Sequence, residues 1–266
     1  MKVALFKKVS ALIAALAVAG AAAFLLIDGD EGSSEAPEPG PGAVIDALRA
    51  SVPVDVRLER PAKPVGGPSY PLASVRHGQT ISLRSSPGGR VVARVGDRTE
   101  FGSVRVFWIE KLRGAWFGVS VPELPDGRLA WVKDDRLALD LSQTRFWITA
   151  NVSRQLLELH YGDRVLDSFP VTVGSPSSPT PLGDYSVTDG LVGRGLGPWY
   201  GCCVLALSGH QPNLPEGWIG GNRMAIHGTP GSIGGATSHG CLRASDRDMI
   251  SLFARVPLGA PVFIRV

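Results

Sequence analysis

The sequence predicts a mainly β fold, and three observations support this class. Glycine and proline are abundant, with 33 and 21 residues in a chain of 266, which favours short strands and turns over long helices. After residue 71, short runs of β-branched and aromatic residues alternate with turn sequences. Only residues 246–254 have a clearly helical pattern. We therefore expect an N-terminal membrane anchor and linker, a small β-barrel domain, and then a β-sandwich domain with a short helix.

Residues 1–27 have the features of a signal anchor or a signal peptide. Lysines precede an uncharged stretch of 19 residues, Val9–Ile27, and acidic residues follow it. As a helix this stretch would span about 28 Å, close to the roughly 30 Å hydrocarbon core of a membrane. Ala21-Ala22-Ala23 offers a cleavage site, but the apolar run continues beyond it. We expect an uncleaved anchor that leaves the rest of the chain on the extracytoplasmic face of the membrane, with cleavage and a secreted protein as the alternative.

The charge balance argues against a nucleic-acid partner. The net charge of +3 comes from Lys2, Lys7 and Lys8, the only charged residues among the first 27. The rest of the chain carries 24 basic and 24 acidic residues, so it has no overall excess of positive charge to attract a phosphate backbone. Nothing in the sequence indicates an oligomeric state.

Residues 28–71 read as a linker. They are rich in Pro, Gly, Ser, Glu and Ala, as in EGSSEAPEPGPG, and such a composition cannot fill a core. We expect an extended tether, interrupted by a short helical patch around Ala43–Ala50.

Residues 72–139 predict a small β-barrel, because five short strands alternate with turn signals. The runs LRSSPGG, GAWFGV and LAWV resemble the Src-homology-3-type domains of bacterial exported proteins. That resemblance implies a module that binds wall peptides, and a plain spacer is the alternative. The expected strands are Ile81–Leu83, Val91–Val95, Ser103–Ile109, Trp116–Val121 and Ala130–Val132.

Residues 142–266 form the third predicted domain. A meander is expected first, with Tyr161-Gly162-Asp163 as a hairpin turn. Ser245 is placed to cap the helix expected over Asp246–Ala254, whose first turn is acidic. The expected strands are Phe146–Asn151, Gln155–His160, Arg164–Val173 and, at the end of the chain, Pro261–Val266.

The chain has three cysteines, too few for a dense disulfide framework. Cys202 and Cys203 are adjacent, and we expect them to be unpaired buried residues. A bridge between the two neighbours is the alternative. Cys241 is left over, and an unpaired thiol in an exported protein requires an explanation.

The segment IHGTPGSIGGATSHGCLRASD, residues 226–246, carries the most chemical information. A cysteine nucleophile must become a thiolate, and a nearby imidazole assists this. His227 and Cys241 are the candidates for this pair. The flanking glycines would let substrate and backbone approach closely, and the backbone N–H groups of Gly240 and Cys241 could form an oxyanion hole.

A zinc site is the sharpest alternative for these residues. His239 and Cys241 lie on the same side of a strand at H-x-C spacing, where His227 could join them. A fourth ligand is not evident in the sequence. A structural histidine beside a buried cysteine is the remaining possibility.

The same block closely resembles the signature of the L,D-transpeptidase catalytic domain. The matching residues are His227-Gly228 and then Ser238-His239-Gly240-Cys241-Leu242-Arg243, and SPTPLGDYSV resembles the family's T-P-x-G turn with its following strand. The likeness covers about 120 residues. Two features depart from the usual pattern of this signature. His227 and Cys241 are only 14 positions apart, and Arg243 stands where asparagine is common.

The resemblance implies a cysteine acyltransferase of peptidoglycan that needs no cofactor. Cys241 would attack a donor stem tetrapeptide and release D-alanine, and a neighbouring stem's side-chain amine would resolve the acyl-enzyme into a cross-link between third residues. His227 would be the base, held by a carbonyl near Gly228, and His239 and Gly240 would support the oxyanion. Arg243, Ser238 and Tyr200 are the candidate substrate-binding residues.

Alternative functions use the same site differently. Resolution of the acyl-enzyme by water would give an L,D-carboxypeptidase, and by another amine a wall-anchoring enzyme. A non-catalytic wall-binding protein is a third class, although a binder does not need both His227 and Cys241. We expect four residues of an apparent insertion to pack a satellite core, with a lid over the cleft as the alternative; they are Trp199, Tyr200, His210 and Trp218.

Overall fold

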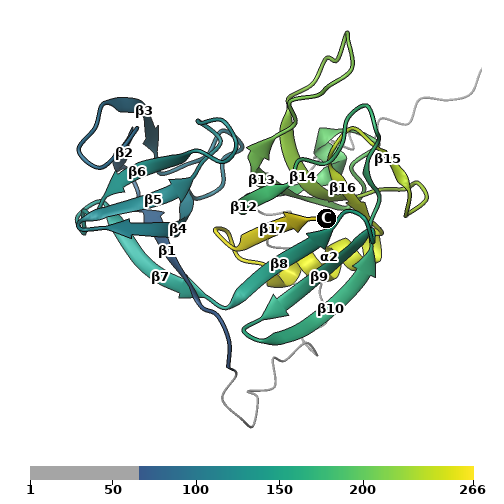
Figure 1. Cartoon of the computed structure of the whole chain (residues 1–266), viewed down its shortest axis with the longest axis horizontal. Coiled ribbons are helices and arrows are strands. Elements are labelled where there is room, and N and C mark those ends of the chain that lie inside the picture. The colour runs from purple at the N-terminus through teal and green to yellow at the C-terminus, as the bar shows by residue number, and fades with distance from the viewer. Residues whose placement is uncertain (1–65) are drawn as a thin grey trace, which may run out of the picture. The chain divides into compact units, whose positions relative to one another are not determined.

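The computed structural model describes residues 66–266, and this part of the chain is mainly β (Figure 1). The predicted fold class is therefore confirmed. The expected anchor at 1–27, nearly all of the linker and the patch at 43–50 lie outside the described residues. Within residues 66–266 no helix has the length and apolar character needed to cross a bilayer.

The first sheet has seven strands, where the sequence predicted five, in the order β3-β2-β6-β5-β4-β1-β7. The two missed strands pair with each other over their whole length, from Tyr70↔Thr144 to Val75↔Leu139. A pairing between residues so far apart in the chain leaves little local signal in the sequence. The first of these two strands also contains a proline, which is uncommon inside strands, so its residues were assigned to the linker. The strands are β1 (Tyr70–Val75), β2 (Thr80–Arg84), β3 (Val91–Gly96), β4 (Val106–Arg113), β5 (Trp116–Ser120), β6 (Leu129–Lys133) and β7 (Leu139–Thr144).

The second sheet has eight strands in the order β10-β9-β8-β17-β12-β13-β14-β16. A separate parallel pair joins β11 to β15. The expected meander and final strand are present. The strands are β8 (Phe146–Asn151), β9 (Leu156–Tyr161), β10 (Arg164–Pro170), β11 (Val173–Gly174), β12 (Gly183–Val192), β13 (Cys203–His210), β14 (Arg223–Gly228), β15 (Ala236–Ser238), β16 (Leu242–Ala244) and β17 (Pro261–Arg265).

The expectation that residues 199–218 form an insertion is partly wrong. The strand β13 lies within this stretch and is an interior strand of the sheet. Seven of its eight residues are buried, which is typical of a strand covered on both faces and gives no alternating pattern to recognise. A short 3-10 helix, η1 (Gly193–Leu196), precedes this strand.

The helix α2 (Asp246–Arg255) forms where it was predicted, one residue longer at its end. The Ser245 hydroxyl accepts a hydrogen bond from the Asp248 N–H at 3.1 Å, which confirms the predicted cap. Met249, Leu252 and Phe253 are buried at helical spacing and pack into the core of the second sheet. This packing places α2 against β13 and β14.

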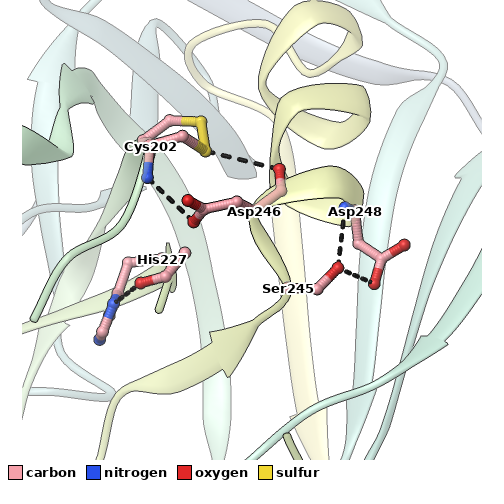
Figure 2. The surroundings of a disulfide bond; sticks show 7 residues. Cys202, His227, Ser245, Asp246 and Asp248 are labelled. Carbon is pink, nitrogen blue, oxygen red and sulfur yellow. Dashed lines mark hydrogen bonds between the residues drawn. A yellow bond between two sulfur atoms is a disulfide. The ribbon is translucent and has the colours of Figure 1, made fainter. Parts of the chain in front are cut away.

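The expectation for the adjacent cysteines is wrong, since Cys202 and Cys203 form a disulfide. Successive residues of a regular strand point to opposite faces, which would keep two sulfurs apart. Cys202 lies just before β13, after a turn in which Gly201 has φ 57°, so the strand rule does not apply to it. Figure 2 shows the bridge beside the first residue of α2.

Side chains from the two sheets contact each other within one compact unit. The rings of Trp108 and Phe263 are 5.6 Å apart and perpendicular. The Asp126 carboxylate accepts the His210 backbone N–H at 2.9 Å, and Arg223 pairs with Glu100 at 2.5 Å. These contacts connect the first sheet to the strands that carry the candidate site.

Candidate active site

Three predicted site residues share one face of the second sheet. β14 and β16 run parallel, with His227 opposite Arg243, and residues opposite each other in a sheet point to the same side. Cys241 lies two residues before Arg243, so it points to that side as well. His227, Cys241 and Arg243 all line one cavity of about 370 Å³.

The geometry of His227 fixes its tautomer. Its Nδ1 lies 2.6 Å from the Gly228 carbonyl oxygen. A carbonyl only accepts hydrogen bonds, so Nδ1 carries the proton and Nε2 keeps its lone pair. The residue is 4% exposed, and this burial is the main reason that the pKa of His227 falls to about 4. At neutral pH the imidazole is therefore uncharged and able to accept a proton.

The Cys241 thiol is protonated at rest. Burial raises the pKa of Cys241, and the hydrogen bond from the backbone at Ala225 and the positive charge of Arg243 oppose this shift. The same charge also disfavours an imidazolium at His227. The resting pair is therefore a neutral thiol and a neutral imidazole, so a thiolate requires proton transfer during the attack.

Ser238 and Gly240 do not take the places expected for them. Ser238 is completely buried, and its hydroxyl donates to the Cys241 carbonyl at 2.6 Å and accepts the Gly240 N–H at 3.1 Å. Neither residue lines the cavity. The Gly240 N–H is thus occupied within the loop and is not free to bind an oxyanion, and Ser238 shapes the loop instead of meeting substrate.

The Gly240–Cys241 peptide is held by Thr180, which the sequence reading placed in the turn without giving it a role. The Thr180 hydroxyl accepts the Gly174 N–H at 2.8 Å and donates to the Gly240 carbonyl at 2.9 Å. Because a trans peptide is planar, with C=O and N–H pointing in opposite directions, this bond turns the Cys241 N–H away from Thr180.

Gly240 is required at its position for two reasons. Its φ of 111° is unfavourable for other residues, and a Cβ there would lie 2.0 Å from Nε2 of Gln211. Gln211 in turn donates to the Pro179 carbonyl at 2.8 Å. The turn before β12 and the loop before Cys241 are thereby joined through buried side chains.

Replacing Thr180 by valine tests this arrangement. Valine keeps the shape but leaves the Gly240 carbonyl without its donor, so we expect kcat for acylation to fall about tenfold or more, with little change in KM. Thr180→Ser should restore most of the rate, because serine keeps the hydroxyl. Single-turnover acylation kinetics measure the effect, and an equal loss in both variants would contradict the role of the hydroxyl.

Behind His227, two glycines make room for Asp246. The Asp246 carboxylate accepts the Cys202 N–H at 2.9 Å, and the Cys202 sulfur contacts the Asp246 carbonyl at 3.6 Å (Figure 2). A Cβ on Gly228 or Gly201 would lie 2.2 or 2.1 Å from the Asp246 carboxylate. Gly228 therefore makes room for Asp246 and for the backbone at Cys202, so the close approach expected at this glycine is made by the protein itself.

Aromatic residues surround the cavity on its exposed side. The ring of Tyr200 lies 4.9 Å from the ring of His227, and burial raises the pKa of Tyr200. Trp199 is 74% exposed and Trp218 40%, and both line the cavity, so they do not pack the expected satellite core. His239 is exposed and its ring is 4.9 Å from that of Trp218.

Among residues 66–266, no three His, Cys, Asp or Glu side chains are grouped so that they could hold a metal ion. His239 lines the cavity near Trp218, while His227 is bound to its own strand through Gly228. The alternative of a zinc site therefore finds no ligand group in the described part of the chain.

A histidine with a free ring nitrogen and a cysteine on one cavity define a cysteine–histidine site. Residues 145–264 match the family of L,D-transpeptidase catalytic domains, named YkuD. The match covers the same part of the chain as the resemblance seen in the sequence and confirms that resemblance. The Src-homology-3-type likeness of the preceding residues stays a prediction.

Two curated relatives align with nearly the same region. The chain is 33% identical over 119 residues to YkuD of Bacillus licheniformis and 32% identical over 121 residues to YkuD of Bacillus subtilis, both named as candidate L,D-transpeptidases. The alignments cover 44% and 45% of this chain, and 64% and 65% of the relatives. The chain thus spans just under two thirds of their length.

Solved structures show a more distant likeness. The L,D-transpeptidase from Mycobacterium smegmatis is 18% identical with a TM-score of 0.37, covering 61% of this chain and 90% of that one. A mutant L,D-transpeptidase of Enterococcus faecium is 20% identical with a TM-score of 0.37, covering 50% of this chain and 52% of that one.

Proposed function

We propose that this protein is an L,D-transpeptidase that cross-links peptidoglycan with Cys241 as its nucleophile. The observation that carries the proposal is the placement of Cys241, neutral His227 and Arg243 on one cavity within a matched catalytic domain. The substrate would be the stem peptides of the wall, as the resemblance to L,D-transpeptidases implies.

The first half-reaction is acyl transfer from the donor stem to the enzyme. The lone pair on His227 Nε2 takes the proton of the Cys241 thiol as the sulfur attacks the carbonyl of the third stem residue. The Cys241 N–H, turned by the Thr180 bond, is available to stabilise the oxyanion. The tetrahedral intermediate collapses to a thioester, and the terminal D-alanine leaves with the proton from His227.

The second half-reaction releases the acyl group to an amine. The side-chain amine of a neighbouring stem attacks the thioester, gives its proton to His227 and forms an amide, and the regenerated thiol recovers a proton. Arg243 is the candidate for holding the donor carboxylate, because a guanidinium pairs with a carboxylate through two hydrogen bonds. His239 and Tyr200 are positioned at the cavity to contact the stem.

The arrangement along the chain suits this role. We propose that residues 1–27 anchor the protein at the extracytoplasmic face of the membrane and that residues 28–71 extend the following domains towards the wall. The division into a barrel at 72–139 and a catalytic domain at 142–266 belongs to the same proposal. It is supported by the separate core clusters of the two sheets.

Product analysis separates transpeptidase from carboxypeptidase activity. The full-length protein in detergent is mixed with a soluble disaccharide-tetrapeptide, and the products are identified by mass spectrometry. A dimer cross-linked between third residues, formed with loss of one D-alanine, is the expected result. Loss of D-alanine without any dimer would assign the enzyme to the carboxypeptidases, and the absence of both products would refute acyl transfer.

A further inference from the structure

A groove on the first sheet is lined by four cations. It has a volume of about 350 Å³, and Arg90, Lys111, Arg113 and Arg128 line it without any aspartate or glutamate. All four are exposed, and within residues 66–266 none of them forms a salt bridge. Because the chain beyond its first 27 residues has balanced charge, this is a local concentration of positive charge.

The floor of the groove is shaped by a glycine and a tryptophan. Gly118, in the middle of β5, pairs with Lys111 on one side and Trp131 on the other. A Cβ at Gly118 would lie only 3.2 Å from the Lys111 side chain and 3.3 Å from the Trp131 ring. Because glycine has no Cβ, the space between these two side chains stays open. The Arg113 guanidinium lies 5.2 Å from the centre of the Trp131 ring, so one cation is held in place by stacking.

The groove connects with the candidate active site through adjoining hollows. The cavity of Cys241 and a second hollow of about 430 Å³ share Asn222 in their walls, and that hollow shares Leu124 with the basic groove. The cavity of Cys241 and the basic groove are therefore both neighbours of this second hollow.

The connecting hollow carries two acidic residues, and both have partners. Glu123 pairs with Arg105 at 2.8 Å. Asp126 accepts the His210 backbone N–H at 2.9 Å and lies 3.6 Å from the His210 ring. No lysine or arginine of the described part of the chain lines this hollow, whereas the basic groove beyond it suits a negative group.

We propose that the basic groove binds free carboxylates of peptidoglycan stem peptides on the same wall strand as the stem that reacts at Cys241. This inference rests on the proposed function for the identity of the polymer. An unlinked stem ends in a carboxylate, and guanidinium and ammonium groups are the natural partners of this anion. Repeated stems along one strand let the first sheet and the active site bind together, which raises the effective concentration of donor at Cys241.

Charge reversal in the groove tests the proposal. The double variant Lys111→Glu/Arg128→Glu changes two exposed side chains that make no described side-chain bonds. Arg154→Glu/Arg164→Glu makes the same change in net charge at exposed sites that do not line the groove. Co-sedimentation of the full-length proteins with insoluble peptidoglycan, stripped of phosphate polymers, measures half-saturation at low and high salt. Thermal unfolding checks that each variant folds.

We expect about tenfold or more weaker binding for the groove variant only, with the difference shrinking at high salt. Equal binding of the two variants would overturn the proposal. A loss seen only on walls that still carry phosphate polymers would overturn the assignment to carboxylates and identify a phosphate ligand. Acylation of the wild-type protein by a soluble donor is measured in parallel, so its failure would refute the proposed function separately from groove binding.

Discussion

Replacement of Cys241 by alanine is expected to abolish formation of the acyl-enzyme and of cross-linked product. Cys241 is the cysteine that lines the cavity, together with His227. Loss of the nucleophile from a coupled catalytic unit lowers the rate by about 10⁴-fold or more. Intact-mass spectrometry of the full-length protein with the tetrapeptide donor measures this directly, because the wild type should gain the mass of the acyl group.

Two controls accompany this substitution. Alanine fits the half-buried position of Cys241, so the unfolding midpoint should change little. Cys241 is the free cysteine of the described chain, while Cys202 and Cys203 are bonded to each other, so a thiol reagent should modify the wild type once and the variant not at all. An acyl adduct that persists in Cys241→Ala would place the nucleophile elsewhere and contradict the proposed mechanism.

Replacement of His227 by glutamine should lower the acylation rate by about 10²–10⁴-fold, the usual contribution of a general base. Glutamine can still donate a hydrogen bond to the Gly228 carbonyl, so the variant separates the loss of the base from the loss of that contact. Single-turnover acylation is the measurement, with alkylation of Cys241 as a check on access to the thiol. A variant that acylates as fast as the wild type would exclude His227 as the base.

The pH profile provides a sharper signature of the same residue. The pKa of His227 falls to about 4 because of burial, so the base remains unprotonated well below neutral pH. The acylation rate of the wild type should therefore stay nearly level from pH 7 to about 5 and fall as the pH drops through about 4. An acid limb near 6.5 instead would contradict a buried neutral imidazole.

The same shift has a consequence for stability, and its sign follows from the direction of the shift. Below about pH 6.5 the unfolded histidine binds a proton that the folded one rejects. The stability contribution of neutral His227 is thus fully present above pH 6.5 and is lost as the pH falls towards 4, by roughly 3 kcal/mol. His227→Gln should lose less stability over this range than the wild type, a difference that denaturant unfolding can measure.

The catalytic block shows how far sequence reasoning reaches. His227, Cys241 and Arg243 could be selected because nucleophile chemistry needs particular residue types, and the S-H-G-C motif is specific. The cap at Ser245 and the helix after it could be predicted from local hydrogen bonding. Ser238 was assigned to substrate and Gly240 to the oxyanion, but the Ser238 hydroxyl is used by the Cys241 carbonyl and the Gly240 N–H by Ser238. A carbonyl near Gly228 was expected to hold His227, and the Gly228 carbonyl oxygen lies 2.6 Å from Nδ1 of His227.

The sequence by itself determined the mainly β class, the helix over 246–254 and the candidate catalytic pair, His227 and Cys241. These follow from short-range patterns, since side-chain period, turn residues and capping act over a few positions. Only the tertiary structure decided that β1 pairs with β7, that Thr180 holds the Gly240 carbonyl and that four cations from separate strands and turns line one groove. Each of these depends on contacts between residues far apart in the chain, and such contacts are fixed by the packing of the whole fold.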